Sequence, residues 1–321
     1  MNTDRIKLAP SVFMDSGLRR NDGNSPLAPP CYTPAMARPT VQLFYNRTSG
    51  GHCPDRLAAL RAGFEARGAA VLLSECGPGH AIEVGEEASH VCAVGGDGTL
   101  RHVALALARC GRAIPLSVYP AGTVNLVHRE RLFPLDPDGH ASRLLAEGGG
   151  GALHPVALND TFFLACASVG PDSRAVAEVS LALKRRIGKL AYLAAFARIL
   201  LDWRRTPIRL AWDGGELVCE AFYVAKGRYF AGPWSFAPDA DVAEPLLHVV
   251  ALARARRRDF ARFAFALWRG RRVDGLPGAT AFTCTALAAE ADEPLPVQAD
   301  GDPVGALPAS IALHGTPLSL C

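Results

Sequence analysis

No two of the nine cysteines in this 321-residue sequence lie within four positions of each other. Zinc ribbons and thioredoxin-like redox sites need closely spaced thiolates, so the spacing excludes both kinds of site. An odd, dispersed set of cysteines in a chain of this length is typical of buried, reduced thiols, and it favours a cytoplasmic location.

Long apolar segments and a strong excess of one charge are also absent. The best candidate for a membrane-spanning helix, residues 190–201, is shorter than the roughly 20 apolar residues required and is interrupted by Arg198. No unbroken apolar stretch follows Lys7, so we expect no signal peptide. The 34 basic and 31 acidic residues leave a net charge of +3, which gives no general attraction to nucleic acid. We expect a cytoplasmic protein that at most rests on the inner membrane surface.

The length predicts about two domains. Residues 1–36 have no periodicity and are rich in Pro, Asp, Asn, Ser and Gly, so we expect a disordered segment or an upstream extension. Between residues 37 and 149 strands alternate with helices, which predicts a doubly wound α/β domain with a parallel sheet. The expected strands are 41–45, 69–73, 90–94 and 114–119, and the expected helices are 57–67, 82–88 and 100–110.

Beyond the glycines at 148–151, strand-like runs predominate and predict a β-sandwich domain over residues 150–321. Hairpin turns are expected at Asn159-Asp160 and at Asp213-Gly214-Gly215. Helical insertions are expected at 174–204 and 259–270. The expected strands are 153–158, 161–167, 208–212, 216–225, 246–252, 280–286 and 310–313.

The strongest chemical signal is Gly95-Gly96-Asp97-Gly98-Thr99-Leu100, where the third strand meets a helix. The glycines allow the backbone to approach a phosphate closely, and the free amide groups at a helix start favour an anion. Thr99 is expected to cap this helix. A plain strand-to-helix turn, in which Gly and Asp serve only as caps, is the structural alternative. The spacing fits neither a Walker loop nor a complete dinucleotide fingerprint.

This segment resembles the GGDGT signature of diacylglycerol kinases, sphingosine and ceramide kinases, bacterial lipid kinases and, more distantly, NAD kinases. Five further segments resemble the family's loops in the same order: 46–50, 120–125, 159–170, 232–239 and 300–302. The resemblance covers about residues 40–318 and is strongest to the bacterial lipid kinases. It implies a nucleotide-binding α/β domain, a lipid-substrate β-sandwich domain and an active site in the cleft between them.

The resemblance also implies the roles of individual residues. Asp300 would be the general base and Asp97 a second catalytic carboxylate, because a lipid hydroxyl is a poor nucleophile and Mg²⁺ and ATP supply the activated phosphate. From the residues alone, Asp300-Gly301 is equally an ordinary hairpin pair and Ser74 equally an exposed loop serine. The residues that would contact ATP are Asn46, Ser74, Gly95, Gly96, Asp97, Gly98, Thr99, Leu100, Gly122, Thr123 and Asn125.

The sequence departs from the family pattern at three positions. Leu126 stands where the family usually has Asp, and Gly232-Pro233 replaces two adjacent glycines, which predicts a stiffer loop on the lipid side. The family's acidic metal-binding segment becomes Ala243-Glu244-Pro245. Oxygen atoms of Asp241, Glu244 and Leu246 are therefore the expected ligands of a structural Mg²⁺, in a site with less negative charge.

Residues 254–272 contain eight arginines and predict a basic amphipathic helix. Phe260, Phe263 and Leu267 share one face and arginines occupy the other, which suits transient contact with an anionic membrane. The alternative is a surface helix that packs its phenylalanines on the sandwich. A second basic cluster lies at 184–189, and no groove-reading motif accompanies either cluster, so nucleic acid is not an expected partner.

The sequence therefore predicts an ATP- and Mg²⁺-dependent lipid kinase acting on diacylglycerol, a sphingoid base, ceramide or a related lipid. Two alternatives stay open, a nucleotide- or lipid-binding regulator whose chemistry has decayed and an NAD kinase. The sequence does not identify the acceptor lipid or the oligomeric state.

Overall fold

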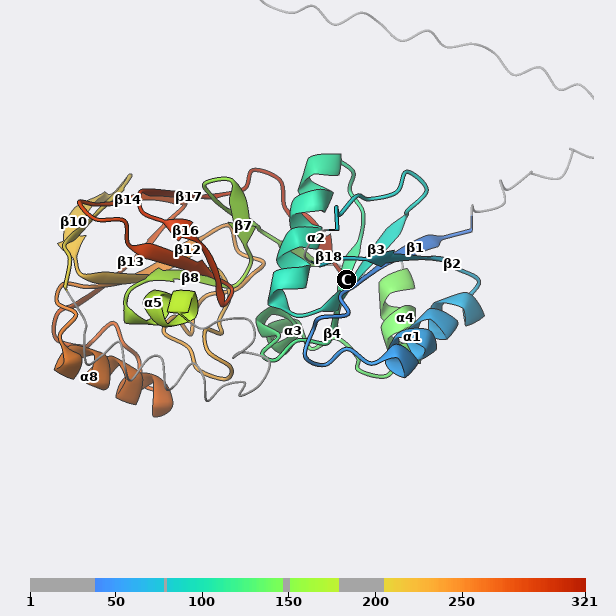
Figure 1. The fold of residues 1–321 in the computed structure, drawn as a ribbon, viewed down its shortest axis with the longest axis horizontal. Coiled ribbons are helices and arrows are strands. Elements are labelled where there is room, and N and C mark those ends of the chain that lie inside the picture. Colours follow the sequence, from blue (N-terminus) through green and yellow to red (C-terminus); the bar gives the residue numbers. More distant parts are fainter. Residues whose placement is uncertain (1–37, 78–79, 147–150, 179–204) are drawn as a thin grey trace, which may run out of the picture. The chain divides into compact units, whose positions relative to one another are not determined.

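The computed structural model describes residues 38–77, 80–146, 151–178 and 205–321. Several predictions fall outside these residues: the segment 1–36, the glycines 148–150, most of the helix 174–204 and the basic cluster 184–189. The described chain contains three six-stranded sheets (Figure 1). Helices cover the first sheet and the other two sheets enclose a common core, so the predicted combination of an α/β part and a β-sandwich is confirmed.

The first sheet has the strand order β2-β1-β3-β4-β18-β5. Its parallel part consists of β1 (Thr40–Tyr45), β2 (Ala70–Glu75), β3 (His90–Gly95) and β4 (Leu116–Pro120). β18 (Leu318–Leu320) pairs parallel with β4, and β5 (Gly151–Leu153) pairs antiparallel with β18. Two strands from beyond residue 150 thus complete this sheet, and the domain division at residue 150 stays a prediction.

Helices pack on both faces of the first sheet because its central strands are apolar on both sides. α1 (Pro54–Ala66) and α4 (Pro137–Leu145) share a core with Val41 and Leu43 of β1. α2 (Asp97–Cys110) and α3 (Leu126–Arg131) share the opposite core with Phe44. α2 ends at Gly111, whose φ of 66° gives the left-handed cap that glycine favours.

The predicted helix over 82–88 is wrong. The apolar side chains of Ile82 and Val84 pack on the α2 core, as in an extended segment. The Gln42 side chain donates to the carbonyl of Glu83 at 3.1 Å and accepts from the amide of Gly85 at 2.9 Å. The Arg112 guanidinium donates to the carbonyls of Gly85, Glu86 and Ala88. Because side chains satisfy these backbone groups, the segment needs no helical hydrogen bonds.

The two remaining sheets form the sandwich. The second sheet has the order β10-β9-β14-β17-β6-β7, with β6 (Val156–Leu158), β7 (Thr161–Phe163), β9 (Ile208–Trp212), β10 (Gly215–Cys219), β14 (Ala286–Ala291) and β17 (Ala309–Leu313). The third has the order β13-β12-β11-β8-β15-β16, with β8 (Cys166–Val169), β11 (Ala221–Ala225), β12 (Leu247–Leu252), β13 (Ala279–Cys284), β15 (Pro296–Ala299) and β16 (Asp302–Ala306). Alternate residues of both sheets fill the core between them.

Four of the predicted strands each consist of two shorter strands. The runs 153–158, 161–167, 216–225 and 280–286 all contain a break at which the chain passes from one sheet to another. Periodicity does not reveal such a change, because in each pair only one or two residues separate the end of one strand from the start of the next, and some of the strands are as short as three residues. Both predicted hairpin turns are confirmed, at Asn159-Asp160 between β6 and β7 and at Asp213-Gly214 between β9 and β10.

Among the described residues of the sandwich, two segments are helical, α5 (Pro171–Glu178) and α8 (Arg257–Trp268). α8 confirms the helix expected at 259–270, and its buried side chains share a core with Tyr223 of β11. Among the described helices, none has the length and apolar character required to cross a bilayer. The eight described cysteines are free thiols.

Candidate active site

The glycine-rich turn after β3 brings separate backbone segments into contact. A β-carbon at Gly95 would lie 2.4 Å from Thr99 Oγ1, and one at Gly122 would lie 2.4 Å from the Cα of Gly96. Only glycine permits such approaches. The predicted capping role of Thr99 is wrong, because α2 begins at Asp97 after an extended Gly96, which leaves Thr99 within the first helical turn.

The loop after β4 lies against this turn. Asn125 has a positive φ of 55°, and its side chain closes the loop by accepting from the amide of Gly122 at 3.0 Å and donating to the Gly122 carbonyl at 2.9 Å. Thr123 is exposed, and a β-carbon at Gly50 would lie 3.7 Å from its hydroxyl oxygen. The loops that follow β1, β3 and β4 therefore meet at the carboxyl edge of the parallel sheet, where α/β folds bind ligands.

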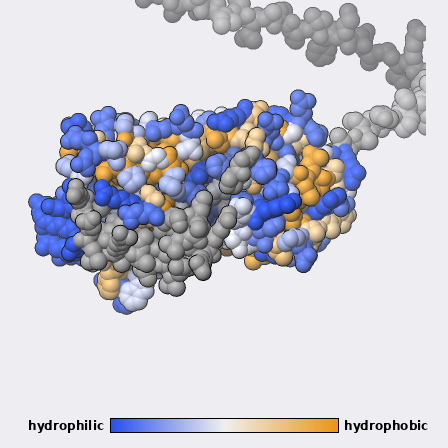
Figure 2. Space-filling view, in the orientation of Figure 1, coloured by the Kyte–Doolittle hydropathy of each residue, from blue (hydrophilic) through white to orange (hydrophobic). Residues whose placement is uncertain are grey.

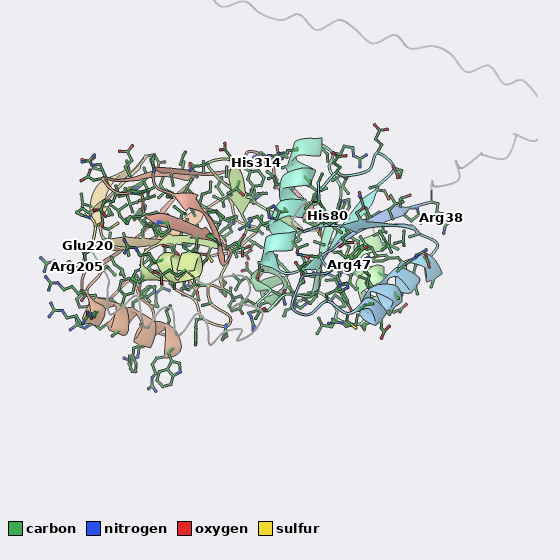
Figure 3. All side chains as sticks on the ribbon, viewed as in Figure 1. Arg38, Arg47, His80, Arg205, Glu220 and His314 are labelled. Carbon is green, nitrogen blue, oxygen red and sulfur yellow. The ribbon has the colours of Figure 1, made fainter. Side chains whose placement is uncertain are left out.

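Asn46 joins the loop after β1 to the glycine turn. Its Oδ1 accepts hydrogen bonds from the amide and the hydroxyl of Thr48, both at 2.8 Å, and its Nδ2 donates to Thr99 Oγ1 at 3.4 Å. The adjacent Arg47, labelled in Figure 3, forms an ion pair with Glu75 at 3.1 Å. These contacts fix the Asn46 amide beside the start of α2.

Two predicted nucleotide-binding residues occupy more enclosed positions. Ser74 lies within β2 and not after it, and its hydroxyl accepts a hydrogen bond from Gln42 Nε2 at 2.8 Å. The Leu100 side chain is buried in the core, and its amide donates to the Gly96 carbonyl at 3.0 Å. Both residues support the neighbouring strands and turn, and a contact of either with nucleotide stays a prediction.

The Asp97 carboxylate joins the starts of α2 and α3. Its Oδ1 accepts a hydrogen bond from the amide of Leu126 at 2.6 Å. Burial raises the pKa of Asp97 to about 7, and the nearby Asp300 carboxylate acts in the same direction, whereas backbone amides at the start of α3 lower it. Asp97 and Asp300 thus lie within electrostatic range of each other, although 202 positions separate them in the sequence.

Asp300 and Gly301 form the two-residue turn between β15 and β16. Their φ values of 50° and 83° are both left-handed, as in the tight hairpin turns that Asp-Gly favours. The Asp300 side chain is 8% exposed and accepts three backbone hydrogen bonds, from Leu164 at 2.9 Å, Ala165 at 2.9 Å and Cys166 at 3.1 Å. The turn therefore directs a carboxylate into the protein, so the hairpin and site interpretations are compatible.

Arg101 is a site residue that the sequence analysis missed. It is 5% exposed, donates to the Ala299 carbonyl at 2.8 Å and pairs with the Asp302 carboxylate at 3.2 Å. Burial raises the pKa of Asp300, and the Arg101 charge opposes this rise. Arg101 thereby ties α2 to the Asp300 turn. In the sequence, the feature that could have indicated this role is the position of Arg101 one helical turn after Asp97.

A buried polar chain holds the other side of the same turn. The Gly301 amide donates to Gln298 Oε1 at 3.0 Å, and Gln298 Nε2 donates to Ser168 Oγ at 2.7 Å. The Ser168 hydroxyl in turn donates to the Asp172 carboxylate. Burial raises the pKa of Asp172 to about 6. Ser168 and Gly301 lie in segments that resemble the family's loops, whereas Gln298 and Asp172 lie outside those segments and were missed.

The predicted metal ligands Asp241, Glu244 and Leu246 do not fit a structural Mg²⁺. The carbonyl oxygens of Asp241 and Glu244 each accept a hydrogen bond from Lys226 Nζ at 2.6 Å, and the Asp241 carboxylate pairs with Arg131 at 2.7 Å. The Leu246 amide donates to the Glu244 carbonyl at 2.9 Å. Throughout the described chain, no group of three His, Cys, Asp or Glu side chains is arranged to hold a metal ion.

α8 buries one face and exposes the other. Phe260, Phe263 and Leu267 are buried, as the packing alternative predicted. Phe265 and Trp268 are 51% and 63% exposed, and their ring centroids lie 5.8 Å apart. Figure 2 shows a small apolar protrusion near the C-terminal end of α8, below a strongly hydrophilic surface. Exposed arginines of this helix and its flanks are Arg254, Arg257, Arg258, Arg262, Arg269, Arg271 and Arg272.

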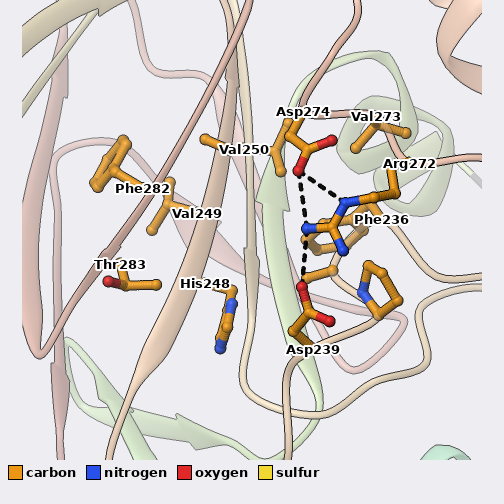
Figure 4. A pocket seen from close by; sticks show the side chains of 13 residues that line it. Phe236, Asp239, His248, Val249, Val250, Arg272, Val273, Asp274, Phe282 and Thr283 are labelled. Carbon is orange, nitrogen blue, oxygen red and sulfur yellow. Dashed lines mark hydrogen bonds and ion pairs between the residues drawn. The ribbon is translucent and has the colours of Figure 1, made fainter.

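A pocket of about 310 Å³ lies elsewhere on the sandwich (Figure 4). Its wall combines apolar side chains of β12 and β13 with Arg272, which pairs with Asp239 at 2.8 Å and Asp274 at 2.9 Å. Three strand spacings separate β12 from β15 in the third sheet, a distance of about 14 Å. The pocket is thus separate from the Asp300 turn, and we assign it no role in the chemistry.

Two family models match the chain. Residues 40–154 match the diacylglycerol kinase catalytic domain, and residues 165–321 match the YegS C-terminal NAD kinase beta sandwich-like domain. The first match contains the glycine turn and Asp97, and the second contains Asp300.

Individual relatives agree with these matches. A protein named diacylglycerol kinase from Bacillus subtilis is 26% identical over 246 residues, covering 73% of this chain and 80% of the relative. A protein named "Probable lipid kinase YegS-like" from Pseudomonas putida is 32% identical over 171 residues, covering 51% and 56%. The crystal structure of a diacylglycerol kinase from Bacillus anthracis superposes with a TM-score of 0.69 at 17% identity, covering 88% of this chain and 96% of that one, which supports the fold.

Proposed function

The chain belongs to the diacylglycerol kinase-like family of lipid kinases, and on this basis we propose that it transfers the γ-phosphate of ATP to a hydroxyl group of a lipid. The observation that carries the proposal is the packing of the Asp300 turn on the start of α2, where Arg101 donates to the Ala299 carbonyl at 2.8 Å and a β-carbon at Gly98 would lie 2.7 Å from the Asp302 carboxylate. Asp97 follows β3 of the first sheet, and Asp300 lies in the turn between β15 and β16 of the sandwich. In the proposed reaction the glycine turn beside Asp97 positions the nucleotide and Asp300 faces the acceptor hydroxyl.

The glycine turn and its neighbouring loops suit the phosphates of ATP. Gly95, Gly96 and Gly122 allow the loops after β3 and β4 to pack closely at the start of α2, and the exposed Thr123 hydroxyl and the fixed Asn46 amide belong to the same group of loops. The first turn of α2 adds amide groups that attract an anion. Mg²⁺ is expected to enter with ATP, bound mainly by phosphate oxygens, and when bound it spreads the charge of the transferring group.

Asp300 is the proposed proton acceptor. An acceptor hydroxyl must lose its proton as it attacks the phosphate, and a positioned carboxylate with a raised pKa accepts that proton more readily than a fully solvated one. Three backbone amides and the neighbouring Arg101 fix this carboxylate, so its orientation does not depend on the substrate. Asp97, whose pKa is about 7, is the second titratable group of the site.

The acceptor lipid is proposed to reach the enzyme from a membrane surface that α8 contacts. Phe265 and Trp268 are large enough to enter the interfacial region of a bilayer, and the surrounding arginines attract anionic lipid headgroups. Because the other face of α8 is buried in the sandwich, the contact leaves the fold intact.

The function is tested by incubating the purified chain with labelled ATP, Mg²⁺ and a total lipid extract, followed by mass spectrometry of the labelled product. We expect a phosphorylated lipid and a loss of roughly 10²- to 10⁴-fold in rate for Asp300→Asn. Glu86→Gln, which removes an exposed carboxylate, is the matched control. Tight ATP binding with no labelled lipid would instead indicate a regulator, and labelled NADP would indicate an NAD kinase.

A further inference from the structure

Lys226 follows β11 and has no exposed surface. Buried lysines are rare, because the ammonium group must find oxygen partners to replace its water. Lys226 Nζ donates to the carbonyls of Asp241 and Glu244, both at 2.6 Å. These carbonyls belong to the loop that precedes β12, so one ammonium group holds two points of this loop.

The acidic side chains around this ammonium are themselves engaged by the protein. The Asp241 carboxylate accepts hydrogen bonds from Arg131 and from a backbone amide, each at 2.7 Å. The Glu130 carboxylate accepts from two backbone amides at 2.7 and 2.8 Å. Both acids, together with Glu244, act electrostatically on Lys226. The loop therefore belongs to an ionic cluster of three acids and two cations, and the cation bonded to its carbonyls is part of the chain.

We propose that the Lys226 ammonium group is the resident cation of the loop 241–246 and takes the place of the structural Mg²⁺ that the family resemblance implies. Mg²⁺ needs several oxygen ligands at about 2.0–2.1 Å, but here two inward carbonyls are already bonded to a positive group that would repel it. The sequence of the loop 241–246 is consistent with a lysine in place of Mg²⁺. Ala243 and Pro245 stand where the family has acids and glycine, and a single positive charge needs fewer acids than a divalent ion.

The proposal is tested by thermal unfolding of the full chain without nucleotide, in EDTA and with added Mg²⁺. For the wild type we expect the same melting temperature in both buffers, because the cation of the loop cannot be chelated. Lys226→Met should lower the melting temperature by several degrees in EDTA, and Mg²⁺ should recover part of the loss by binding the released carbonyls.

The matched control is Arg112→Met, which also removes a cation from backbone carbonyls, those of Gly85, Glu86 and Ala88. It should lower the melting temperature without recovery by Mg²⁺. A wild-type melting temperature that falls in EDTA would overturn the proposal, as would equal responses of the two variants to Mg²⁺. If Lys226→Met does not fold, the wild-type comparison decides alone. Because the experiment measures stability and not activity, neither a supporting nor a contradicting result bears on the proposed function.

Discussion

Asp97→Asn is expected to stabilise the protein above neutral pH while it abolishes lipid phosphorylation. The folded-state pKa of Asp97 is about 7, against an ordinary value of 3.8. Because the folded state binds this proton more tightly than the unfolded state, its contribution to stability is present at low pH and is lost as the pH rises towards 7. At pH 8 the folded protein carries a charged, poorly solvated carboxylate beside Asp300. Asparagine removes that charge and can still accept the hydrogen bond from the Leu126 amide.

The size of the effect follows from the pKa difference. About three pH units correspond to about 4 kcal/mol at 1.36 kcal/mol per unit. Because Asp97 keeps partial contact with solvent, we expect about half of this, ~2 kcal/mol, or roughly 4–8 °C in melting temperature.

The assay compares melting temperatures of the wild type, Asp97→Asn and the exposed control Glu86→Gln at pH 5 and pH 8, together with labelled phosphate transfer. The gain of Asp97→Asn should appear at pH 8, shrink at pH 5 and be absent in the control. A variant that is less stable than the wild type at pH 8, or that retains wild-type turnover, would refute the reasoning.

Three further variants test the surrounding structure. Arg101→Met should lower the free energy of unfolding in urea by about 2–3 kcal/mol, because it removes the donor of the buried Ala299 carbonyl and one ionic partner of Asp302, and a change below about 0.5 kcal/mol would contradict this. Gln298→Leu should lower kcat at least about tenfold without raising KM for ATP, because it frees the turn that positions the general base from Gln298 and Ser168 and leaves the glycine turn unchanged; a rise in KM alone would contradict this. The double variant Phe265→Ser/Trp268→Ser should lose binding to anionic vesicles in sedimentation, whereas Val218→Ser, which alters another exposed apolar residue, should not; equal losses would remove α8 as the contact.

The parallel sheet was predictable because its signals are local. Each of its predicted strands is a short apolar run that ends at turn-forming residues, and α1 and α2 show helical spacing between them. The prediction of a helix over 82–88 was wrong because of contacts that the spacing of residues in the sequence does not reveal. Its backbone groups bond to Gln42 and Arg112, which lie far away in the sequence and make an extended conformation as well satisfied as a helix.

The candidate site was predictable only where its residues form a motif. The family resemblance identified the glycine turn, Asp97 and Asp300, and the structure brings these two acids into electrostatic contact. Arg101 and Gln298 were missed, because their roles arise from contacts with residues on other elements. The expected metal loop illustrates the same limit. The oxygen atoms of a short segment resemble a metal site, but its carbonyls bind the ammonium group of Lys226, which follows β11.

Leu126, one of the departures from the family pattern, has a structural explanation consistent with activity. Its side chain is 3% exposed in the α2 core, and its amide donates to Asp97. The hydrogen bond to Asp97 is therefore made by the backbone amide, and it does not require a particular side chain at position 126. An aspartate here would add a further carboxylate near Asp97, whose pKa is already raised by burial and by the charge of Asp300. Leucine thus relieves charge crowding and leaves both proposed catalytic acids in position.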